Sequence, residues 1–148
     1  MGATLLLILF APMFVLVASL VFLFLGRPLL FVQRRPGKGA RLFKIQKFRT
    51  MLPEASGGVF VPESKRITTL GRILRVTSLD ELPQLWNILI GDMSFVGPRP
   101  LLEEYLPFYT REEKSRHSVR PGLTGLAQIN GRNFLGARER LGLDVEYA

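Results

Sequence analysis

Apolar positions dominate the start of the chain, and no charged side chain occurs before Arg27. A straight helix over the run from Ala3 to Leu25 would be roughly 34 Å long, enough to cross the hydrocarbon core of a bilayer. Pro12 interrupts this run, and an interior proline removes a helical hydrogen bond and bends the helix. Two geometries stay open. Composition favours a spanning helix, because membrane helices tolerate proline, whereas a bend at Pro12 would return the chain to the side it entered.

The next segment has the pattern of a β-hairpin. Residues 28–33 are short and apolar, residues 34–40 form a turn rich in glycine and basic side chains, and residues 41–51 alternate between apolar and polar positions. Four side chains of the alternating segment are expected to face inward, namely Leu42, Phe43, Ile45 and Phe48. Four others are expected to face outward, namely Lys44, Gln46, Lys47 and Arg49.

Beyond the hairpin, the pattern predicts mainly short helices. They are expected over residues 69–76, 101–109, 111–117 and 137–147. Residues 127–130 are expected to form a short strand. Two stretches rich in glycine and proline, residues 53–65 and 120–125, are expected to be loops, the first of them mobile. A small hairpin with several short helices indicates an α/β chain of the α+β type.

Residues 78–90 carry the most informative pattern. Ser78 followed by Glu81 has the spacing of a capping box, so a helix is predicted to begin at Ser78. Apolar positions then recur at helical spacing and are expected to form one buried face, namely Leu79, Leu82, Leu85, Trp86, Leu89 and Ile90.

The acidic pair in this first turn has two interpretations. Asp80 and Glu81 can be an ordinary helix cap. Alternatively, the positive end of the helix keeps Asp80 ionised and attracts a phosphate group that Asp80 can attack. Adjacent residues on a helix point about 100° apart, so the two carboxylates would have distinct tasks rather than share a proton.

Arginines next to proline are the second chemical feature. Pro98 and Pro100 restrict the backbone around Arg99, and a guanidinium can bind a phosphate group through two hydrogen bonds. Arg120, which precedes a Pro-Gly pair, repeats this arrangement. The simpler interpretation is an exposed turn with an incidental arginine. His117, the only histidine, is expected to be structural.

Composition sets limits on the class of protein. With 148 residues there is room for one compact domain after the apolar run. The chain has 20 Lys and Arg against 12 Asp and Glu, and a basic segment after an apolar one is typical of a cytoplasmic membrane face with anionic lipid. A non-catalytic module that binds such lipid is therefore an alternative. Because RNA- and DNA-binding signatures are missing, a membrane-tethered nucleic-acid binder is a weaker hypothesis than a lipid-binding module. The absence of cysteine excludes disulfides and thiolate metal sites.

Three segments, taken in order, resemble a known family. They are FKIQKFRTM from Phe43, LRVTSLDELPQLWNILIGDMSFVGPRPL from Leu74, and RHSVRPGLTGLAQINGRN from Arg116. These segments resemble the bacterial sugar transferases, in particular the small monotopic phosphoglycosyl transferases that initiate N-linked glycan and related glycoconjugate assembly. The resemblance runs from about Pro12 to Asp144.

The resemblance implies a reaction and a role for each residue. Such enzymes transfer a sugar 1-phosphate from a UDP-sugar to polyprenol (undecaprenyl) phosphate and release UMP. Asp80 is implied to attack the β-phosphate and form a covalent phosphosugar intermediate, and Glu81 to help hold Mg²⁺. The implied substrate-binding residues are Lys47, Arg49, Arg99, Arg120 and Asp144.

The resemblance also implies a membrane arrangement. The N-terminal helix of this family is re-entrant, so Pro12 becomes the predicted bend. Residues 1–26 are then the membrane helix and residues 27–148 a catalytic domain on the cytoplasmic face of the bacterial inner membrane. The implied partners are the two substrates, membrane lipid and downstream glycosyltransferases, with no nucleic acid. Relatives extend further at both ends, so the chain is expected to be truncated there, and Leu126 and Ala137 stand where a tryptophan is common.

Overall fold

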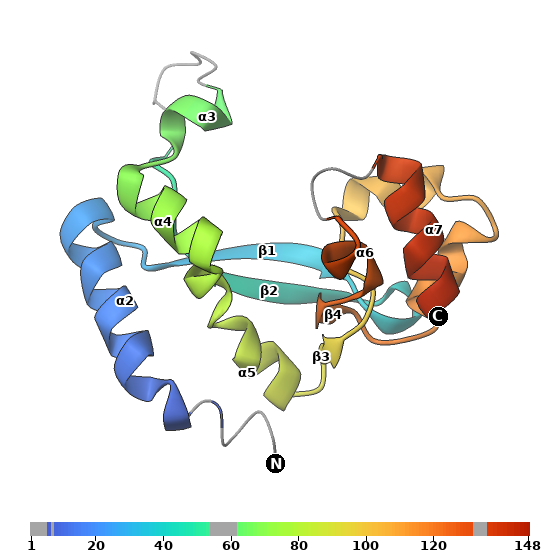
Figure 1. The fold of residues 1–148 in the computed structure, drawn as a ribbon, viewed down its shortest axis with the longest axis horizontal. Coiled ribbons are helices and arrows are strands. Elements are labelled where there is room, and N and C mark those ends of the chain that lie inside the picture. Colours follow the sequence, from blue (N-terminus) through green and yellow to red (C-terminus); the bar gives the residue numbers. More distant parts are fainter. Residues whose placement is uncertain (1–5, 7, 54–61, 132–135) are drawn as a thin grey trace. The chain divides into compact units, whose positions relative to one another are not determined.

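The computed structural model describes residues 6, 8–53, 62–131 and 136–148 (Figure 1). The described part combines short helices with two small two-stranded sheets, which confirms the predicted α+β class. The chain divides into two compact units and passes between them within the hairpin and again after Leu85. Unit 1 comprises Met1–Val32 and Gln46–Leu85, and unit 2 comprises Gln33–Ile45 and Trp86–Ala148.

The apolar run contains a break beside Pro12. Residues 8 and 9 are helical, Phe10 is a turn with φ −91° and ψ 3°, and helix α2 (Ala11–Leu25) begins directly after it. Pro12 lies in the first turn of α2, where a missing backbone N–H costs no helical hydrogen bond. Within the described ranges, no helix is both long and apolar enough to span a bilayer.

The predicted hairpin is confirmed. Strand β1 (Leu30–Pro36) pairs with β2 (Leu42–Phe48), and a one-turn 3-10 helix, η1 (Lys38–Ala40), joins them. Ile45 and Phe48 are buried, as expected.

The expected burial of Leu42 is wrong. Leu42 is exposed and Phe43 is half-buried. Two consecutive strand residues face opposite sides, so both could not face one core. Among the residues expected to face outward, Lys44 is exposed, whereas three are half-buried, namely Gln46, Lys47 and Arg49.

Helix α4 (Thr69–Thr77) confirms the predicted helix and lies close to the chain that follows β2. The hydroxyl of its N-cap, Thr68, accepts a hydrogen bond from the Gly71 N–H at 3.0 Å. Position 71 needs a glycine, because a Cβ there would lie 1.9 Å from the carbonyl oxygen of Thr50. This close approach sets α4 against the end of the hairpin.

Most of the loop predicted over residues 53–65, namely residues 54–61, lies outside the described residues. The end of the predicted loop is instead a single helical turn, α3 (Glu63–Arg66), supported by a 3.0 Å hydrogen bond from the Lys65 N–H to the Pro62 carbonyl.

The helix predicted to begin at Ser78 does not form. Ser78 has a left-handed backbone, with φ 58° and ψ 17°, and it ends α4 without a capping hydrogen bond from its side chain. Leu79–Glu81 form one 3-10 turn, η2, and α5 (Gln84–Leu89) begins only after Pro83. Proline lacks the N–H that a continuous helix would use there. The capping-box prediction is therefore wrong, and Pro83 was the sequence signal against it.

Only part of the predicted buried face is buried. Leu85 is buried, and Leu79 and Leu82 pack half-buried against the core of unit 1. The buried residues of that core are Val17, Val21, Phe48 and Leu74. The remaining three residues of the predicted face are exposed, namely Trp86, Leu89 and Ile90. The break at Pro83 separates the two halves of the pattern.

Unit 2 contains a sheet that the sequence analysis missed. Strand β3 (Ser94–Val96) pairs in parallel with β4 (Gly122–Thr124). Glycine permits this pairing, because a Cβ on Gly122 would lie 2.1 Å from the backbone nitrogen of Gly97. The loop predicted over residues 120–125 therefore contains a strand.

The remaining elements of unit 2 are helical. The strand predicted over residues 127–130 is wrong, since α6 (Leu126–Ile129) is a helix, and periodicity cannot separate the two types in so short a segment. Two predicted helices are present as 3-10 helices, η3 (Glu103–Phe108) and η4 (Glu113–His117). Helix α7 (Ala137–Tyr147) has the predicted bounds.

Candidate functional site

The predicted site residues fall into two groups, one in each unit. Unit 1 contains Lys47, Arg49, Asp80 and Glu81, and unit 2 contains Arg99, Arg120 and Asp144.

Asp80 is a buried carboxylate in the 3-10 turn η2, with 7% of its surface exposed. Burial raises the pKa of the Asp80 carboxyl, and the charge of Glu81 raises it further. Lys47 and Arg75 act in the opposite direction. The predicted stabilisation of the anion by the positive end of a helix is not found, because η2 is a single 3-10 turn and burial is the largest influence on the pKa of Asp80.

Glu81, the second acid of the pair, is bound to a lysine. The Nζ atom of Lys47, on β2, lies 2.6 Å from Oε1 of Glu81, and both side chains are half-buried. The hairpin and η2 are thus joined at the acidic pair. Glu81 thus has a cation as its partner, whereas the neighbouring Asp80 is buried away from water.

Arg75 is a residue of this site that the sequence analysis did not single out. It lies in the last turn of α4, and its charge lowers the pKa of Asp80. Its Nε donates to the hydroxyl of the buried Thr50 at 3.0 Å, and its Nη2 donates to the sulfur of Met51 at 3.0 Å. The available signal was a basic residue in the helical turn that precedes the acidic pair.

Arg49, predicted to bind substrate, is engaged with backbone groups. Its guanidinium donates to three successive carbonyl oxygens at the end of α2, those of Leu25, Gly26 and Arg27, the last two at 3.0 Å. These carbonyls have no partner within the helix, so Arg49 caps α2 with a positive charge.

The acidic pair fits the predicted magnesium ion. Among the described residues, no group of three or more histidine, cysteine, aspartate or glutamate side chains is arranged to hold a metal. Mg²⁺ does not require one, since one or two carboxylates, water and substrate phosphate oxygens complete its six positions. A divalent cation would also relieve the repulsion by which Glu81 raises the pKa of Asp80.

In unit 2, the two arginine turns predicted from sequence lie side by side. The Gly122 N–H donates to the carbonyl oxygen of Pro98 at 3.0 Å. A Cβ on Gly97 would lie 2.5 Å from the carbonyl oxygen of Arg120. The backbones that carry Arg99 and Arg120 are therefore in direct contact, which a sequence separation of this size does not reveal.

Asp144 forms a buried ion pair with Arg116. Its Oδ2 lies 2.7 Å from Nη2 of Arg116, and both side chains are almost fully buried. Burial raises the pKa of Asp144, whereas the charge of Arg116 lowers it. The sequence analysis did not single out Arg116, which is the first residue of the third motif. No signal in the local pattern linked it to Asp144.

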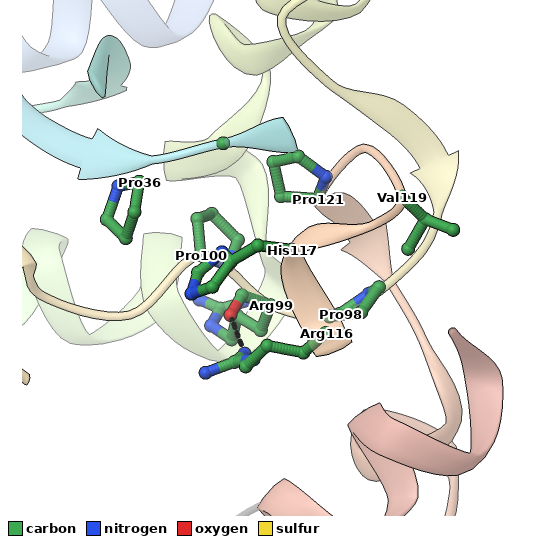
Figure 2. A pocket seen from close by; sticks show the side chains of 9 residues that line it. Pro36, Pro98, Arg99, Pro100, Arg116, His117, Val119 and Pro121 are labelled. Atoms are coloured by element: carbon green, nitrogen blue, oxygen red, sulfur yellow. Dashed lines mark hydrogen bonds between the residues drawn. The ribbon is translucent and has the colours of Figure 1, made fainter. Parts of the chain in front are cut away.

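Figure 2 shows a small pocket of unit 2 beside these residues. Its lining consists of Pro36, Gly37, Pro98, Arg99, Pro100, Arg116, His117, Val119 and Pro121. Burial lowers the pKa of His117, and the nearby charge of Arg116 lowers it further, while a hydrogen bond with the backbone of Gly37 raises it. The centroid of the imidazole ring lies 5.7 Å from that of the Tyr109 ring. The structural role expected for this histidine stays a prediction.

The whole chain, residues 1–148, matches the family of bacterial sugar transferases. This chain belongs to that family. The family predicted from the three sequence motifs is thus confirmed.

Several bacterial sugar transferases are similar to this chain. An uncharacterised sugar transferase, EpsL, of Bacillus subtilis is 51% identical over 130 residues, which cover 87% of this chain and 64% of that protein. The UDP-glucose:undecaprenyl-phosphate glucose-1-phosphate transferase of Caulobacter vibrioides is 42% identical, with 99% of this chain and 59% of that protein covered. The exopolysaccharide production protein PSS of Rhizobium leguminosarum is 42% identical, with 95% and 78% covered. This chain thus spans about six-tenths of the length of the first two relatives.

Proposed function

We propose that this chain is a phosphoglycosyl transferase that moves a sugar 1-phosphate from a UDP-sugar to undecaprenyl phosphate. The observation that carries the proposal is the buried Asp80 carboxylate beside the ion pair of Glu81 and Lys47. The name of the Caulobacter relative describes this reaction class for glucose 1-phosphate. Family membership and site chemistry therefore support the same activity.

The proposed reaction has two displacements at one phosphorus atom. A carboxylate oxygen of Asp80 attacks the β-phosphorus of the UDP-sugar, the bond to the bridging oxygen breaks, and UMP leaves with its electron pair. An oxygen of undecaprenyl phosphate then attacks the same phosphorus, and the Asp80 carboxylate leaves. The products are UMP and undecaprenyl diphosphosugar, and Asp80 is regenerated.

The surroundings of Asp80 suit a nucleophile. Burial removes the hydration shell that would otherwise shield the carboxylate and raises its pKa, so the anion gains more by forming a bond. Lys47 and Arg75 oppose this shift and keep the anionic form accessible.

Basic side chains and a bound metal ion would neutralise the negative charge of the donor's phosphate groups. We propose that Arg99 and Arg120 bind phosphate oxygens of the donor, with Lys47 close to the acidic pair. Glu81 would help hold the Mg²⁺ ion, which when bound neutralises charge on the diphosphate. Arg49 and Asp144, which are bound to protein groups, would contribute to substrate binding indirectly.

The proposed setting is the cytoplasmic face of the bacterial inner membrane. Helix α2 exposes an apolar set of side chains, namely Val15, Leu16, Phe22, Leu23 and Phe24. Exposed apolar patches of this kind mark contact with a membrane or another protein. With the break at Phe10, they support a re-entrant helix that holds the site near its lipid acceptor. Downstream glycosyltransferases would receive the lipid-linked product.

The direct test is incubation with a panel of labelled UDP-sugars, Mg²⁺ and undecaprenyl phosphate. The unaltered chain should release UMP and carry a labelled sugar phosphate on Asp80, seen by mass spectrometry. Asp80→Ala and Asp80→Asn should abolish both signals, whereas the control Glu112→Gln, at an exposed acid, should keep them. UMP release at the unaltered rate by Asp80→Asn would exclude this nucleophile.

Topology can be tested separately, because the chain has no cysteine. Gly2→Cys and Arg27→Cys are each treated in intact cells with a membrane-impermeant thiol reagent. A re-entrant helix places both sites on the cytoplasmic side, so neither should react until the cells are opened. Reaction at position 2 alone would support a spanning helix.

A further inference from the structure

Arg116 is a buried arginine that holds three acceptors from separate stretches of unit 2. Its Nη1 donates to the hydroxyl of Tyr109 at 3.0 Å. Its Nη2 donates to the carbonyl oxygen of Arg99 at 2.6 Å, drawn as a dashed line in Figure 2, and to Oδ2 of Asp144 at 2.7 Å. The planar guanidinium fork is suited to such simultaneous contacts, which a lysine cannot reproduce.

The backbone of the turn around Arg99 is held at every carbonyl. The oxygen of Pro98 accepts from the Gly122 N–H at 3.0 Å, that of Arg99 accepts from Arg116, and that of Pro100 accepts from Nη1 of Arg35 at 3.4 Å. Both prolines already restrict φ. These contacts leave the backbone of the turn little freedom, so the base of the Arg99 side chain has a set direction.

The ion pair beneath this turn is not explained by stability alone. Arg116 and Asp144 are almost fully buried, and apolar side chains of similar volume often stabilise a fold as well as a buried ion pair does. The pair does provide a fixed charged donor that binds the carbonyl of Arg99 more strongly than a neutral donor would.

We propose that Arg116 is a positioning residue that, with Asp144 as its counter-ion, orients Arg99 toward the phosphate groups of the nucleotide donor. This inference rests on the proposed function. Asp144 then supports substrate binding through Arg116 rather than by contact with the substrate.

The first test is binding of UDP, in the presence of Mg²⁺, by the full chain in detergent. Arg116→Lys keeps the charge beside Asp144 but loses the fork, and should raise the Kd for UDP about tenfold. In an Arg99→Ala background the same substitution should change the Kd less than twofold, because the residue being oriented is absent. An equal loss in both backgrounds would overturn the proposal. Arg111→Lys, at an exposed arginine of the same unit, is the matched control.

The second test does not depend on nucleotide binding. Amide hydrogen exchange over residues 97–103 should become faster in Arg116→Lys and stay unchanged in Arg111→Lys, with helix α4 of unit 1 (Thr69–Thr77) as the internal reference. Unchanged exchange over residues 97–103 would overturn the positioning role. If the unaltered chain does not bind UDP, the proposed function fails, while exchange still decides whether Arg116 holds the turn.

A milder variant covers the case in which Arg116→Lys does not fold. Tyr109→Phe removes one of the three acceptors of Arg116 and leaves the ion pair in place. It should raise the Kd for UDP two- to threefold and increase exchange over residues 97–103. No change in either measurement would count against the proposal.

Discussion

Each unit of the chain buries one aspartate, and the two are surrounded in opposite ways. Burial raises the pKa of both Asp80 and Asp144. After burial, the largest influence on the pKa of Asp80 is another acid, Glu81. For the pKa of Asp144 it is Arg116, bound at 2.7 Å. Under the proposed function, the desolvated carboxylate beside Glu81 is the nucleophile, whereas the carboxylate held by Arg116 has a structural role. Burial alone does not separate these two proposed roles, so the difference lies in the charge of the nearest neighbour.

The largest effect is expected when the acid of the buried ion pair is removed. Asp144→Ala leaves the charge of Arg116 buried without its partner, and should lower the free energy of unfolding by about 3–5 kcal/mol. Denaturant unfolding measures this change. Glu146→Ala, at an exposed acid of the same helix, should stay within about 0.5 kcal/mol. A loss of similar size in both variants would show that the ion pair has no special role.

Each unit also has a helix glycine, and the two differ in how closely other atoms pack around them. Gly71→Ala in unit 1 forces a Cβ to within 1.9 Å of the Thr50 carbonyl oxygen, so it should destabilise the fold by about 1–3 kcal/mol. Gly142→Ala in unit 2 meets no atom within 4 Å and should stabilise by about 0.5 kcal/mol, because alanine is the better helix former. Thermal melting of both variants tests the pair. Equal effects would contradict the close approach of α4 to the hairpin.

Asp80→Asn should stabilise the fold, in contrast to changes at Asp144. Because the pKa of Asp80 is raised, the folded chain binds a proton more readily than the unfolded chain does. The contribution of Asp80 to stability is therefore largest at low pH and is lost as the pH rises through its raised pKa. At neutral pH the variant should gain about 1 kcal/mol, a typical size for a stabilising substitution. The gain should vanish below the ordinary value of 3.8, and a loss at neutral pH would contradict the burial argument.

Lys47→Met gives the smallest expected effect, and it concerns the pH dependence of turnover. Lys47 lowers the pKa of Asp80, so its removal should raise that pKa and move the acidic limb of the rate profile to higher pH. Below neutral pH the rate should fall about two- to fivefold, since a partly exposed ion pair contributes about 0.2–1 kcal/mol. Lys44→Met, at an exposed lysine of the same strand, is the control. An unmoved acidic limb would mean that Lys47 does not act on Asp80.

Local pattern predicted several elements correctly. The hairpin and α4 follow from alternation and helical periodicity within single segments, and α7 has the bounds predicted for it, whereas the burial expected for Leu42 within β2 was wrong. The other errors occurred where a signal was overlooked or a segment was short. Pro83 was the overlooked signal, which broke the helix expected from Ser78, and the apolar residues after Gly125 formed a helix turn where a strand was expected.

By itself, the sequence determined the family, the acidic pair and the two arginine turns, because each is written in consecutive residues. Only the tertiary structure decided that Ser78 turns left-handed, that Asp80 is desolvated and that Arg116 binds both Asp144 and the carbonyl of Arg99. Desolvation and ion pairing depend on groups brought together by folding. Local periodicity carries no information about which distant residues will meet.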